Sequence, residues 1–348
     1  MPATRPAAGI AARLALACLV LLALGLRTWR LGDPSVWFDE ALEIERAAQP
    51  LERVLVARGI DQDPPLYSVG LHAWLRLGDS DGWCRLPGAL AGALAVALVG
   101  AWGRRLGGRA VGLSAAGLLA VSPAAVHYSM EVNQYALVMP LAVALAWSAE
   151  RVIAAPRSGG WPCYTAICIA SLGTHYGLVF PILAQLPFVL VSSWRAAAGR
   201  IGCARHLVAL VAAVLLLWHL GLGRNLAVAH VQGRFGGTDL AGEVAWLQDV
   251  FWRDVIVFLA VPWSGGAALV LARGLAVLAT VGVLWALHRG GPARRSLAAW
   301  MPAVLLSTYV ASGLGWYPFG GRYALMVLPA AIVAVAAGTA APSRLLPG

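Results

Sequence analysis

The chain contains no lysine: all 26 of its basic residues are arginine. Chemistry that depends on a lysine side chain, such as a Schiff base or the phosphate-binding lysine of a P-loop, is therefore excluded. Charged residues of every kind are scarce, at 12% of 348 residues, whereas soluble domains have about 25%. Hydrophobic residues make up 60%. This balance excludes an ordinary soluble domain and excludes disorder, which leaves a polytopic helical membrane protein.

Cysteine is also scarce, and its spacing carries little information. Only five cysteines occur, and no two of them form a Cys-x-x-Cys pair, so the sequence predicts neither a zinc ribbon nor a redox pair. The formal net charge of +10 is compatible with nucleic-acid binding, but membrane proteins acquire the same excess from their cytoplasmic loops. We therefore expect no nucleic-acid partner.

Apolar runs follow one another along most of the chain. The first, at about 14–26, has no convincing cleavage site after it, and we interpret it as an uncleaved transmembrane helix. The sequence therefore predicts an all-α polytopic membrane protein with about ten transmembrane helices, forming a single integral membrane domain over 1–348 without a C-terminal soluble domain. The nine further runs lie at about 86–103, 110–126, 135–149, 161–173, 176–194, 207–222, 266–287, 297–313 and 323–340.

The segment 32–85 differs from the rest, because it holds ten of the sixteen acidic residues. Long loops in compact proteins are usually functional. Within it, 38–49 and 51–57 have the pattern of short amphipathic helices. The run 66–77 is apolar but too short to cross about 30 Å of hydrocarbon, which takes ~20 residues. We therefore expect a large first extracytoplasmic loop that carries juxtamembrane helices.

The arginines indicate the topology. If 66–77 lies on the membrane surface, one side of the membrane holds 14 arginines and a single acid, Glu150. The positive-inside rule then makes that side cytoplasmic, together with the N-terminus. The polar loops, including 32–85, 127–134 and 315–322, are expected to converge outside.

Two adjacent carboxylates, Asp39 and Glu40, follow Trp37 and Phe38 just beyond the first helix. Carboxylates at a membrane interface are partly desolvated, which suits them to general-base catalysis. A simpler interpretation is that Asp39 or Glu40 caps the helix that follows. The residues alone leave both interpretations open.

Further polar residues lie in the first loop or at the outer ends of spans, and each also has a simpler interpretation. Asp63, held rigidly before two prolines, is compatible with a helix start, and His175 with a hydrogen-bonded interface residue. Glu131 is expected at a membrane edge, where a charged side chain is usually paired with another group or takes part in function. Arg322 is compatible with a snorkelling anchor or with a bidentate phosphate ligand.

Taken in this order, the motifs resemble the GT-C glycosyltransferases, in particular the protein O-mannosyltransferase and aminoarabinose-transferase superfamily and its bacterial members that use polyprenyl-phosphate sugars. The resemblance is clearest over about 30–180. It implies an enzyme of the bacterial inner membrane that moves a sugar from a polyprenyl-phosphate carrier to an extracytoplasmic glycan, lipid or protein acceptor. The motifs are Trp37-Phe38-Asp39-Glu40-Ala41, Asp63-Pro64-Pro65-Leu66-Tyr67, Arg85-Leu86-Pro87, Tyr128-Ser129-Met130-Glu131 with Tyr135, Thr174-His175-Tyr176 and Arg322-Tyr323.

The resemblance also implies roles for individual residues. The essential acid of the first loop corresponds to Asp39, which would take the proton of the acceptor hydroxyl in an inverting displacement, while Glu40 would orient that hydroxyl or share the charge. No cofactor is required, although a divalent cation (Mg²⁺ or Mn²⁺) at Asp63, Glu131 and His175 is compatible with their chemistry. The predicted ligands of the donor phosphate are Arg58, Arg85, Arg322 and Tyr323. The predicted substrate contacts are Asp63, Tyr67, Glu131, Gln134, Tyr135, His175 and Tyr176.

The chain departs from the pattern of many family members in two respects. Many relatives have a histidine at the position of Asp63 or an acid–lysine pair nearby, and many carry a C-terminal soluble domain. The alternative function is a transporter or flippase of a lipid-linked or small polar substrate, which would place ionisable groups near the bilayer midplane. A purely structural scaffold would leave the converging acids and arginines unexplained.

Overall fold

A computed structural model describes residues 5–56, 63–156, 159–194, 197–222, 266–289, 292–313 and 322–340. These residues form helices and connecting turns, without a strand among them. Each of the ten apolar runs contains a helix, so the prediction of an all-α polytopic membrane protein is confirmed. The helices long and apolar enough to cross a membrane by themselves are Gly9–Thr28, Asp81–Gly107, Tyr135–Ala154, Tyr176–Trp194 and Ala197–Gly221.

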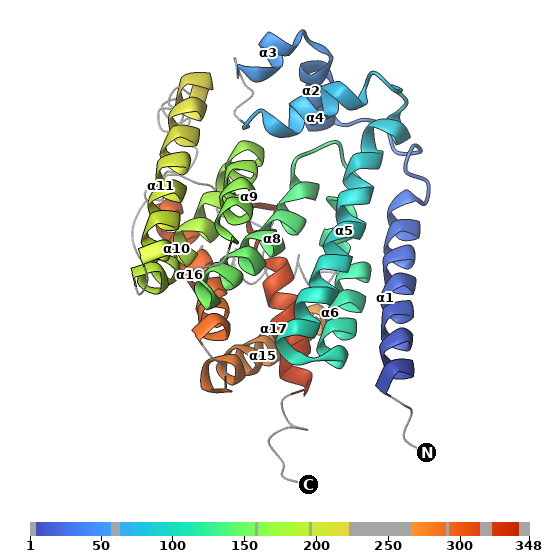
Figure 1. Cartoon of the computed structure of the whole chain (residues 1–348). Coiled ribbons are helices and arrows are strands. Elements are labelled where there is room, and N and C mark those ends of the chain that lie inside the picture. The colour runs from blue at the N-terminus through green and yellow to red at the C-terminus, as the bar shows by residue number, and fades with distance from the viewer. Residues whose placement is uncertain are drawn as a thin grey trace.

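The helices carry the labels of Figure 1, and their bounds are as follows. They are α1 Arg5–Thr28, α2 Phe38–Ala48, α3 Leu51–Leu55, α4 Leu66–Trp74, α5 Asp81–Gly107, α6 Arg109–Val121, α7 Pro123–His127, α8 Tyr135–Ala154, α9 Trp161–Thr174, η1 Tyr176–Leu178, α10 Val179–Trp194, α11 Ala197–Leu217, η2 Trp218–Leu222, α15 Gly266–Arg289, α16 Pro292–Gly313, η4 Arg322–Ala324 and α17 Leu328–Ala340.

The bundle has two distinct ends. Helices α2, α3 and α4 lie over one end, which we call the loop end. The first turn of α1 and the last turn of α17 lie at the other, which we call the terminal end (Figure 1). Helix α4 has only nine residues and lies over the loop end, as expected for a surface helix rather than a span. The first loop therefore sits where polar groups from several helices converge.

Glycines let α5 and α6 pack closely as a hairpin. A Cβ on Gly103 would lie 3.2 Å from the Cα of Gly112, so the two backbones nearly touch. The turn between the helices places Gly108 at a φ of 89°, which side chains disfavour. This hairpin gives α5 a rigid position, and the first turn of α5 carries Arg85.

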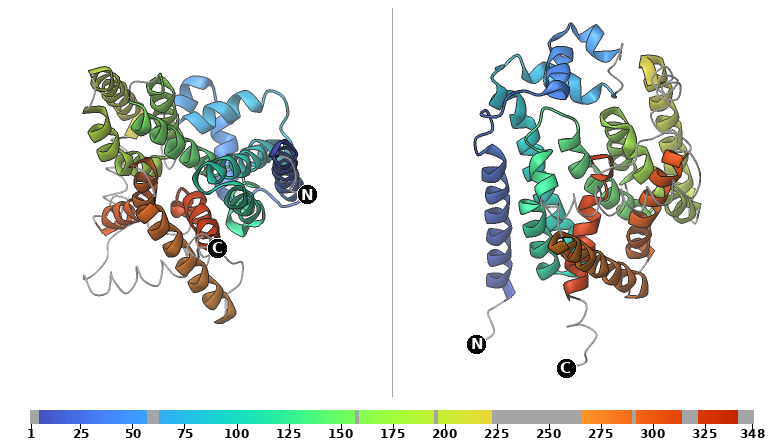
Figure 2. Two further views of the ribbon diagram at one scale, coloured as in Figure 1. Left: turned by 60° about the horizontal axis from the view of Figure 1, so that its bottom comes forward. Right: turned by 180° about the vertical axis from the view of Figure 1, so that it is seen from behind.

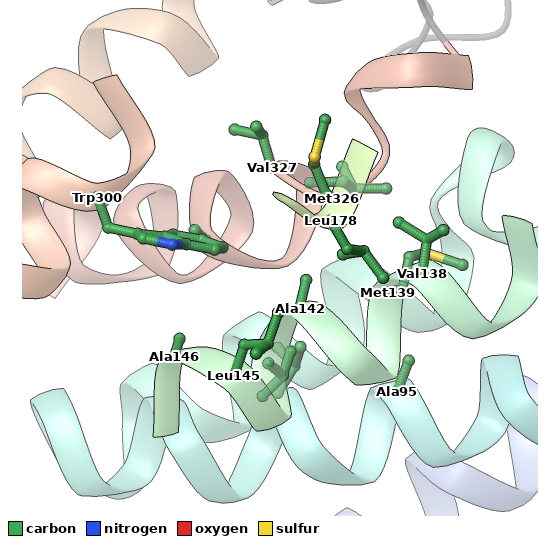
Figure 3. Packing of buried hydrophobic residues seen from close by; sticks show 14 of the residues in the cluster. Ala95, Val138, Met139, Ala142, Leu145, Ala146, Leu178, Trp300, Met326 and Val327 are labelled. Carbon is green, nitrogen blue, oxygen red and sulfur yellow. The ribbon is translucent and has the colours of Figure 1, made fainter. Parts of the chain in front are cut away.

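The main core surrounds α8, whose apolar residues face α5, α10, α16 and the segment before α17. Figure 3 shows Met139 and Leu145 of α8 close to Leu178, Trp300 and Met326, all of them buried. Within a bilayer such close packing stabilises the bundle through van der Waals contacts between the helices. The core thus joins the middle of the chain to its C-terminal helices, and so places η4 near α8.

Helix α1 is mostly exposed to lipid, but one charged residue anchors it. The Arg27 side chain is fully buried and donates to the carbonyl oxygens of Ala23, Leu119 and Ala120 at 3.0–3.4 Å. Leu119 and Ala120 lie in the last turn of α6, where carbonyls lack helical partners and carry partial negative charge. Arg27 therefore fixes α1 against α6 just below the loop end.

Helix α15 runs in a different direction from the one that the sequence predicts. The run 266–287 was expected to span the membrane, and the helix is present, but it runs across the terminal end of the bundle rather than along it (Figure 2). Gly282 and Gly338 explain how it packs, because a Cβ on either would collide with a carbonyl oxygen of the other helix. The contact between α15 and α17 is thus a close backbone crossing.

Candidate active site

Glu40 lies in the first turn of α2 and is almost fully buried, at 1% exposed. Its Oε2 accepts a hydrogen bond from the Trp37 backbone N–H at 3.3 Å, and its Oε1 accepts one from the Val132 N–H at 2.9 Å. The capping interpretation therefore holds for Glu40. The contact with Val132 also ties the first loop to the second, 92 residues further along the chain.

Arg85 forms a bidentate ion pair with the same carboxylate. Its Nε and Nη2 donate to Glu40 at 2.8 and 2.7 Å, and its remaining N–H groups donate to the carbonyl oxygens of Leu31, Pro34 and Ser35. Burial raises the pKa of Glu40, but the bonds from Arg85 and Val132 outweigh it and lower that pKa overall. Glu40 is therefore an ionised structural group.

These contacts correct two predictions. All five N–H groups of Arg85 are engaged, and its side chain is only 3% exposed, so it has no donor left for a donor phosphate. Glu40 is enclosed in the same way and does not face an acceptor. Both residues hold the first loop on α5 instead of contacting substrate.

Gly88 explains how the second loop reaches this position. A Cβ at Gly88 would lie 2.9 Å from the Ser129 carbonyl oxygen and 3.1 Å from that of Glu131. Only glycine lets the loop pack directly on α5 at this level, and this brings the Val132 N–H to Glu40. The motif Arg85-Leu86-Pro87 is therefore followed directly by Gly88, the position at which α5 packs against the second loop.

Asp39 has a different environment from its neighbour. Its Oδ2 lies 3.4 Å from Nη1 of Arg322, although 283 residues separate them in the chain. The side chains of Asp39 and Arg322 are 35% and 39% exposed, so both remain accessible. The structure thus brings together the predicted base and a predicted phosphate ligand at the loop end.

Aromatic side chains surround the Arg322 guanidinium. Its Nη2 donates to the Tyr323 hydroxyl at 2.9 Å, and its carbon lies 5.0 Å from the Tyr323 ring centroid and 5.9 Å from that of Tyr135. The Tyr135 ring in turn lies 5.5 Å from Tyr128 and 5.3 Å from His175. These cation–π and ring contacts hold the guanidinium beside Asp39 while leaving part of it exposed.

His175 belongs to this group but is not placed to bind a metal with its predicted partners. Its ring is buried, and its Nδ1 accepts a hydrogen bond from the Gly177 N–H at 3.1 Å. Burial, with a smaller contribution from Arg322, lowers the pKa of His175 to about 4, so the imidazole is neutral at physiological pH. Tyr176, the next residue, is half-buried at the start of η1.

Asp63, Glu131 and His175, which were predicted as a cation site, do not come together in the structure. Among the described residues, which include all three, no group of three or more potential metal ligands comes together. Glu131 pairs with His127 at 3.1 Å, and the Asp63 carbonyl oxygen accepts hydrogen bonds from Arg46. Glu131 and His175 thus have different partners, and the backbone of Asp63 is held by Arg46.

The other predicted substrate contacts lie deeper than expected. Tyr67 is 6% exposed in a small core with Leu71 and Val132, where burial raises the pKa of its hydroxyl. Gln134 is 2% exposed, and its Oε1 has no hydrogen-bond partner among the described residues. Direct substrate contact for both residues stays a prediction. Arg58 lies outside the described residues.

The sequence did not lead us to expect the contacts that Arg46 and His127 make. Arg46 is buried in α2 and donates to the carbonyl oxygens of Val54 and Asp63, so it fixes α3 and the start of α4. Its position three residues after Glu43, on the apolar face of an amphipathic helix, was a signal for burial. His127, four residues before Glu131, had the spacing of a helical pair.

The comparisons with known proteins agree with this arrangement. Residues 62–219 match the family model of dolichyl-phosphate-mannose-protein mannosyltransferases. The fold is similar to that of ArnT from Cupriavidus metallidurans bound to undecaprenyl phosphate, with a TM-score of 0.59 and 17% identity over 97% of this chain and 60% of ArnT. It is also similar to the oligosaccharyltransferase AglB from Archaeoglobus fulgidus in complex with an inhibitory peptide and a dolichol-phosphate, with a TM-score of 0.55 and 13% identity over 96% of this chain and 50% of AglB. No curated protein matches the sequence.

The molecule therefore shares its fold with ArnT and AglB, in agreement with the resemblance to the GT-C glycosyltransferases drawn from its motifs. The chain spans 60% of the length of ArnT and 50% of the length of AglB. At these identities the two structures show a shared fold. The family model covers the first-loop residue Asp63 and continues through the second loop to α11 and the start of η2, whereas Asp39 and Arg322 lie outside it.

Proposed function

We propose that the chain is a membrane glycosyltransferase that moves a sugar from a polyprenyl-phosphate carrier to an acceptor at the loop end. The proposal depends on one observation above all. A half-exposed carboxylate, Asp39, and a half-exposed guanidinium, Arg322, meet at 3.4 Å at the loop end, although 283 residues separate them in the chain. This pair supplies a base and a phosphate ligand side by side.

Arg322 is suited to the donor phosphate. Its guanidinium is fixed by Tyr323 and Tyr135 but remains 39% exposed, so a phosphate oxygen can approach it. The phosphodiester of such a donor has one negative charge, like a carboxylate, and its two free oxygens accept bidentate hydrogen bonds from arginine. Donor binding is thus expected to compete with Asp39 for Arg322 and to release the carboxylate.

Asp39 is suited to the acceptor. Once released, its carboxylate accepts the proton of the acceptor hydroxyl as that oxygen attacks the anomeric carbon. The bond from the anomeric carbon to the phosphate oxygen breaks with inversion, and the lipid phosphate leaves with its charge beside Arg322. A phosphate is already a good leaving group, so no general acid is needed. Because Asp63, Glu131 and His175 do not converge, we assign no cation to them.

The membrane orientation is part of the proposal. Arginines gather at the terminal end, which the positive-inside rule makes cytoplasmic, and the loop end then faces outward from a bacterial inner membrane. A single cysteine replacing the exposed Glu45 in a cysteine-free background should react with an impermeant thiol reagent in intact cells. A cysteine replacing Arg200 at the other end should react only after permeabilisation. The reverse pattern would contradict the orientation.

The transporter alternative is less well supported by the ion pairs. Glu40–Arg85 and Asp39–Arg322 lie at the loop end, and Arg105–Glu150 joins the last turns of α5 and α8 at the terminal end. A transporter would use ionisable groups near the middle of its spans. Pairs at the helix ends favour an enzyme that works at the membrane surface.

The test uses the purified protein and a panel of radiolabelled polyprenyl-phosphate sugars offered with mixed glycan, lipid and peptide acceptors. We expect consumption of one donor by the wild type and little by Asp39→Asn. The matched control is Asp33→Asn, which changes an exposed acid of the same loop whose ion pair with Arg30 lies away from Arg322. Equal activity of the two variants, or no consumption of any donor, would contradict the proposal.

A further inference from the structure

The pair of Asp39 and Arg322 has the geometry of a contact that can open. Its one hydrogen bond runs from Nη1 of Arg322 to Oδ2 of Asp39 at 3.4 Å, and both side chains are half-exposed. The buried Arg85, by contrast, donates twice to Glu40, at 2.7 and 2.8 Å. Exposed ion pairs contribute little stability, because water competes for both charges. The pair of Asp39 and Arg322 is therefore closed in the unliganded enzyme, but only weakly.

Arg322 keeps its position when Asp39 leaves. Its Nη2 donates to the Tyr323 hydroxyl at 2.9 Å, and its guanidinium carbon lies 5.0 Å from the Tyr323 ring centroid and 5.9 Å from that of Tyr135. None of these contacts involves Asp39, so they hold the guanidinium at the loop end in either state. Opening the pair thus frees Nη1 for another oxygen without moving the arginine.

The Asp39 carboxylate is also stabilised away from Arg322. It lies in the first turn of α2, where the backbone N–H groups lack helical partners and carry partial positive charge. A carboxylate in the first turn is favoured whether or not an arginine pairs with it. The buried pair of Glu40 and Arg85 meanwhile fixes α2 itself. Opening the contact with Arg322 therefore needs only a rotation of the Asp39 side chain.

Sugar transfer changes the charge of the group beside Arg322; this step rests on the proposed function. The donor phosphate is a diester with one negative charge. When the bond to the anomeric carbon breaks, the phosphate keeps the electron pair and becomes a monoester, whose second pKa is about 6, so that it carries nearly two charges at neutral pH. The spent carrier therefore binds Arg322 more strongly than the donor does, and turnover requires a means of releasing it.

We propose that Asp39 has a second role after transfer, as an internal competitor that displaces the spent polyprenyl phosphate from Arg322. Asp39 first gives the proton that it took from the acceptor hydroxyl to water, and its carboxylate then returns to Arg322 as the carrier leaves. The same contact closes the site in the unliganded enzyme. An exposed pair closes with an equilibrium constant of about 2–5, so it weakens carrier binding about three- to sixfold.

The test measures carrier binding without sugar transfer. The delipidated full chain in detergent is titrated with undecaprenyl phosphate, and the complex is quantified by native mass spectrometry. We expect Asp39→Asn, which keeps the shape of the side chain but loses its charge, to bind about three- to sixfold more tightly than the wild type. Asp33→Asn, in which an exposed acid paired with Arg30 is changed, should bind like the wild type. Equal or weaker binding by Asp39→Asn would overturn the proposal.

Arg322→Gln separates competition from simple repulsion. A negative charge close to a bound phosphate weakens binding even if it never touches Arg322. If Asp39 acts by occupying Arg322, the change Asp39→Asn should no longer tighten binding once Arg322 is glutamine, although that background binds the carrier more weakly. A gain of the same size in both backgrounds would show repulsion alone and would overturn the proposal.

The release rate tests the displacement itself. Protein loaded with deuterated undecaprenyl phosphate is chased with an excess of the unlabelled lipid, and the wild type should exchange about three- to sixfold faster than Asp39→Asn. Equal exchange rates would mean that Asp39 only obstructs entry, and would overturn its role in release. Carrier binding that does not depend on Asp39 would overturn this inference and leave the proposed function standing. Absence of binding by the wild type and by every variant would contradict both.

Discussion

Asp39 and Glu40 are neighbours on one helix and belong to different parts of the molecule. Glu40 is 1% exposed and forms a bidentate pair with Arg85, while Asp39 is 35% exposed and forms a single 3.4 Å contact with Arg322. Successive residues on an α-helix point about 100° apart. One carboxylate therefore faces the interior of the loop end, and the other faces its accessible side.

The difference in exposure indicates separate roles for the two adjacent acids. The buried pair is saturated with hydrogen bonds and fixes the position of α2 on α5. The exposed pair keeps accessible charge on both partners, which a substrate can compete for. We infer that Glu40 positions the helix from which Asp39 acts, so damage to the two residues should be seen in different measurements.

The largest effect is expected from breaking the buried pair. Glu40→Ala leaves the Arg85 guanidinium buried without its counter-charge, and losing one partner of such a pair destabilises proteins by about 3–5 kcal/mol. We expect a large drop in the thermal unfolding midpoint of the purified protein and poor recovery from membranes. An unchanged midpoint would mean that the pair is not structural.

A double variant sharpens this prediction. Replacing both partners by methionine removes the orphaned charge, so Glu40→Met with Arg85→Met should recover part of the stability lost in Glu40→Ala. Recovery should be incomplete, because the N–H groups of Trp37 and Val132 also lose their acceptor. A double variant less stable than Glu40→Ala would argue against the buried charge as the cause.

The second effect concerns turnover instead of stability. Asp39→Asn keeps the shape of the side chain but cannot accept a proton, and general bases contribute about 10²–10⁴-fold. Turnover should fall at least about a hundredfold while the unfolding midpoint stays near that of the wild type, because the pair with Arg322 is half-exposed. Near-normal turnover would remove Asp39 as the base.

Asp39→Glu is the useful control for geometry. It keeps the charge and moves the carboxylate by about one methylene, and a displacement of ~1 Å can reduce a rate ~10²-fold. A glutamate variant with normal turnover, together with an inactive asparagine variant, would show that charge matters more than position.

The helices could be predicted from the sequence because hydropathy is a local property. Each of the ten apolar runs contains a helix, and the amphipathic segments at 38–49 and 51–57 formed α2 and α3 nearly as expected. The run 110–126 was expected as one helix, but α6 ends at Val121 because Pro123 disfavours helical geometry in Ser122. The direction of α15 could not be predicted, since it depends on a crossing with α17 about 50 residues away.

The partners within the site could not be predicted in the same way. Arg85 and Arg322 both flank apolar runs and look equivalent as phosphate ligands in the sequence. Only the packing of α5 against the first loop shows that all N–H groups of Arg85 donate to Glu40 and to three carbonyl oxygens. The same holds for Asp63, Glu131 and His175, whose side chains suit a cation but meet other partners.

The third effect tests the accessible arginine. Arg322→Ala removes a charge-assisted bidentate contact worth on the order of 2–3 kcal/mol, so the apparent KM for the donor should rise roughly 30- to 150-fold. Arg322→Lys keeps the charge without the fork and should be impaired less. Donor titrations with both variants measure this. An unchanged donor dependence would favour the snorkelling-anchor interpretation of Arg322.

The smallest effect is expected from His127 and Glu131, a third pair whose exposure is unequal at 60% and 12%. The hydrogen bond from His127 to Glu131 raises the pKa of the histidine despite partial burial. A raised pKa means that the pair stabilises the fold fully below the ordinary histidine pKa of about 6.5, and that this contribution is lost as pH rises through the raised value.

His127→Gln should therefore lower the unfolding midpoint at about pH 6 and have little effect at about pH 9, where His127 is neutral in both states. The exposed histidine lets solvent screen the pair, so the contribution should stay below about 1 kcal/mol and the shift within about 2–4 °C. His219→Gln, an exposed histidine in η2, controls for a general effect of losing a histidine. A shift that is equal at both pH values would mean that His127 acts through packing and not through its charge. The pair would then resemble neither the buried nor the accessible pair of α2.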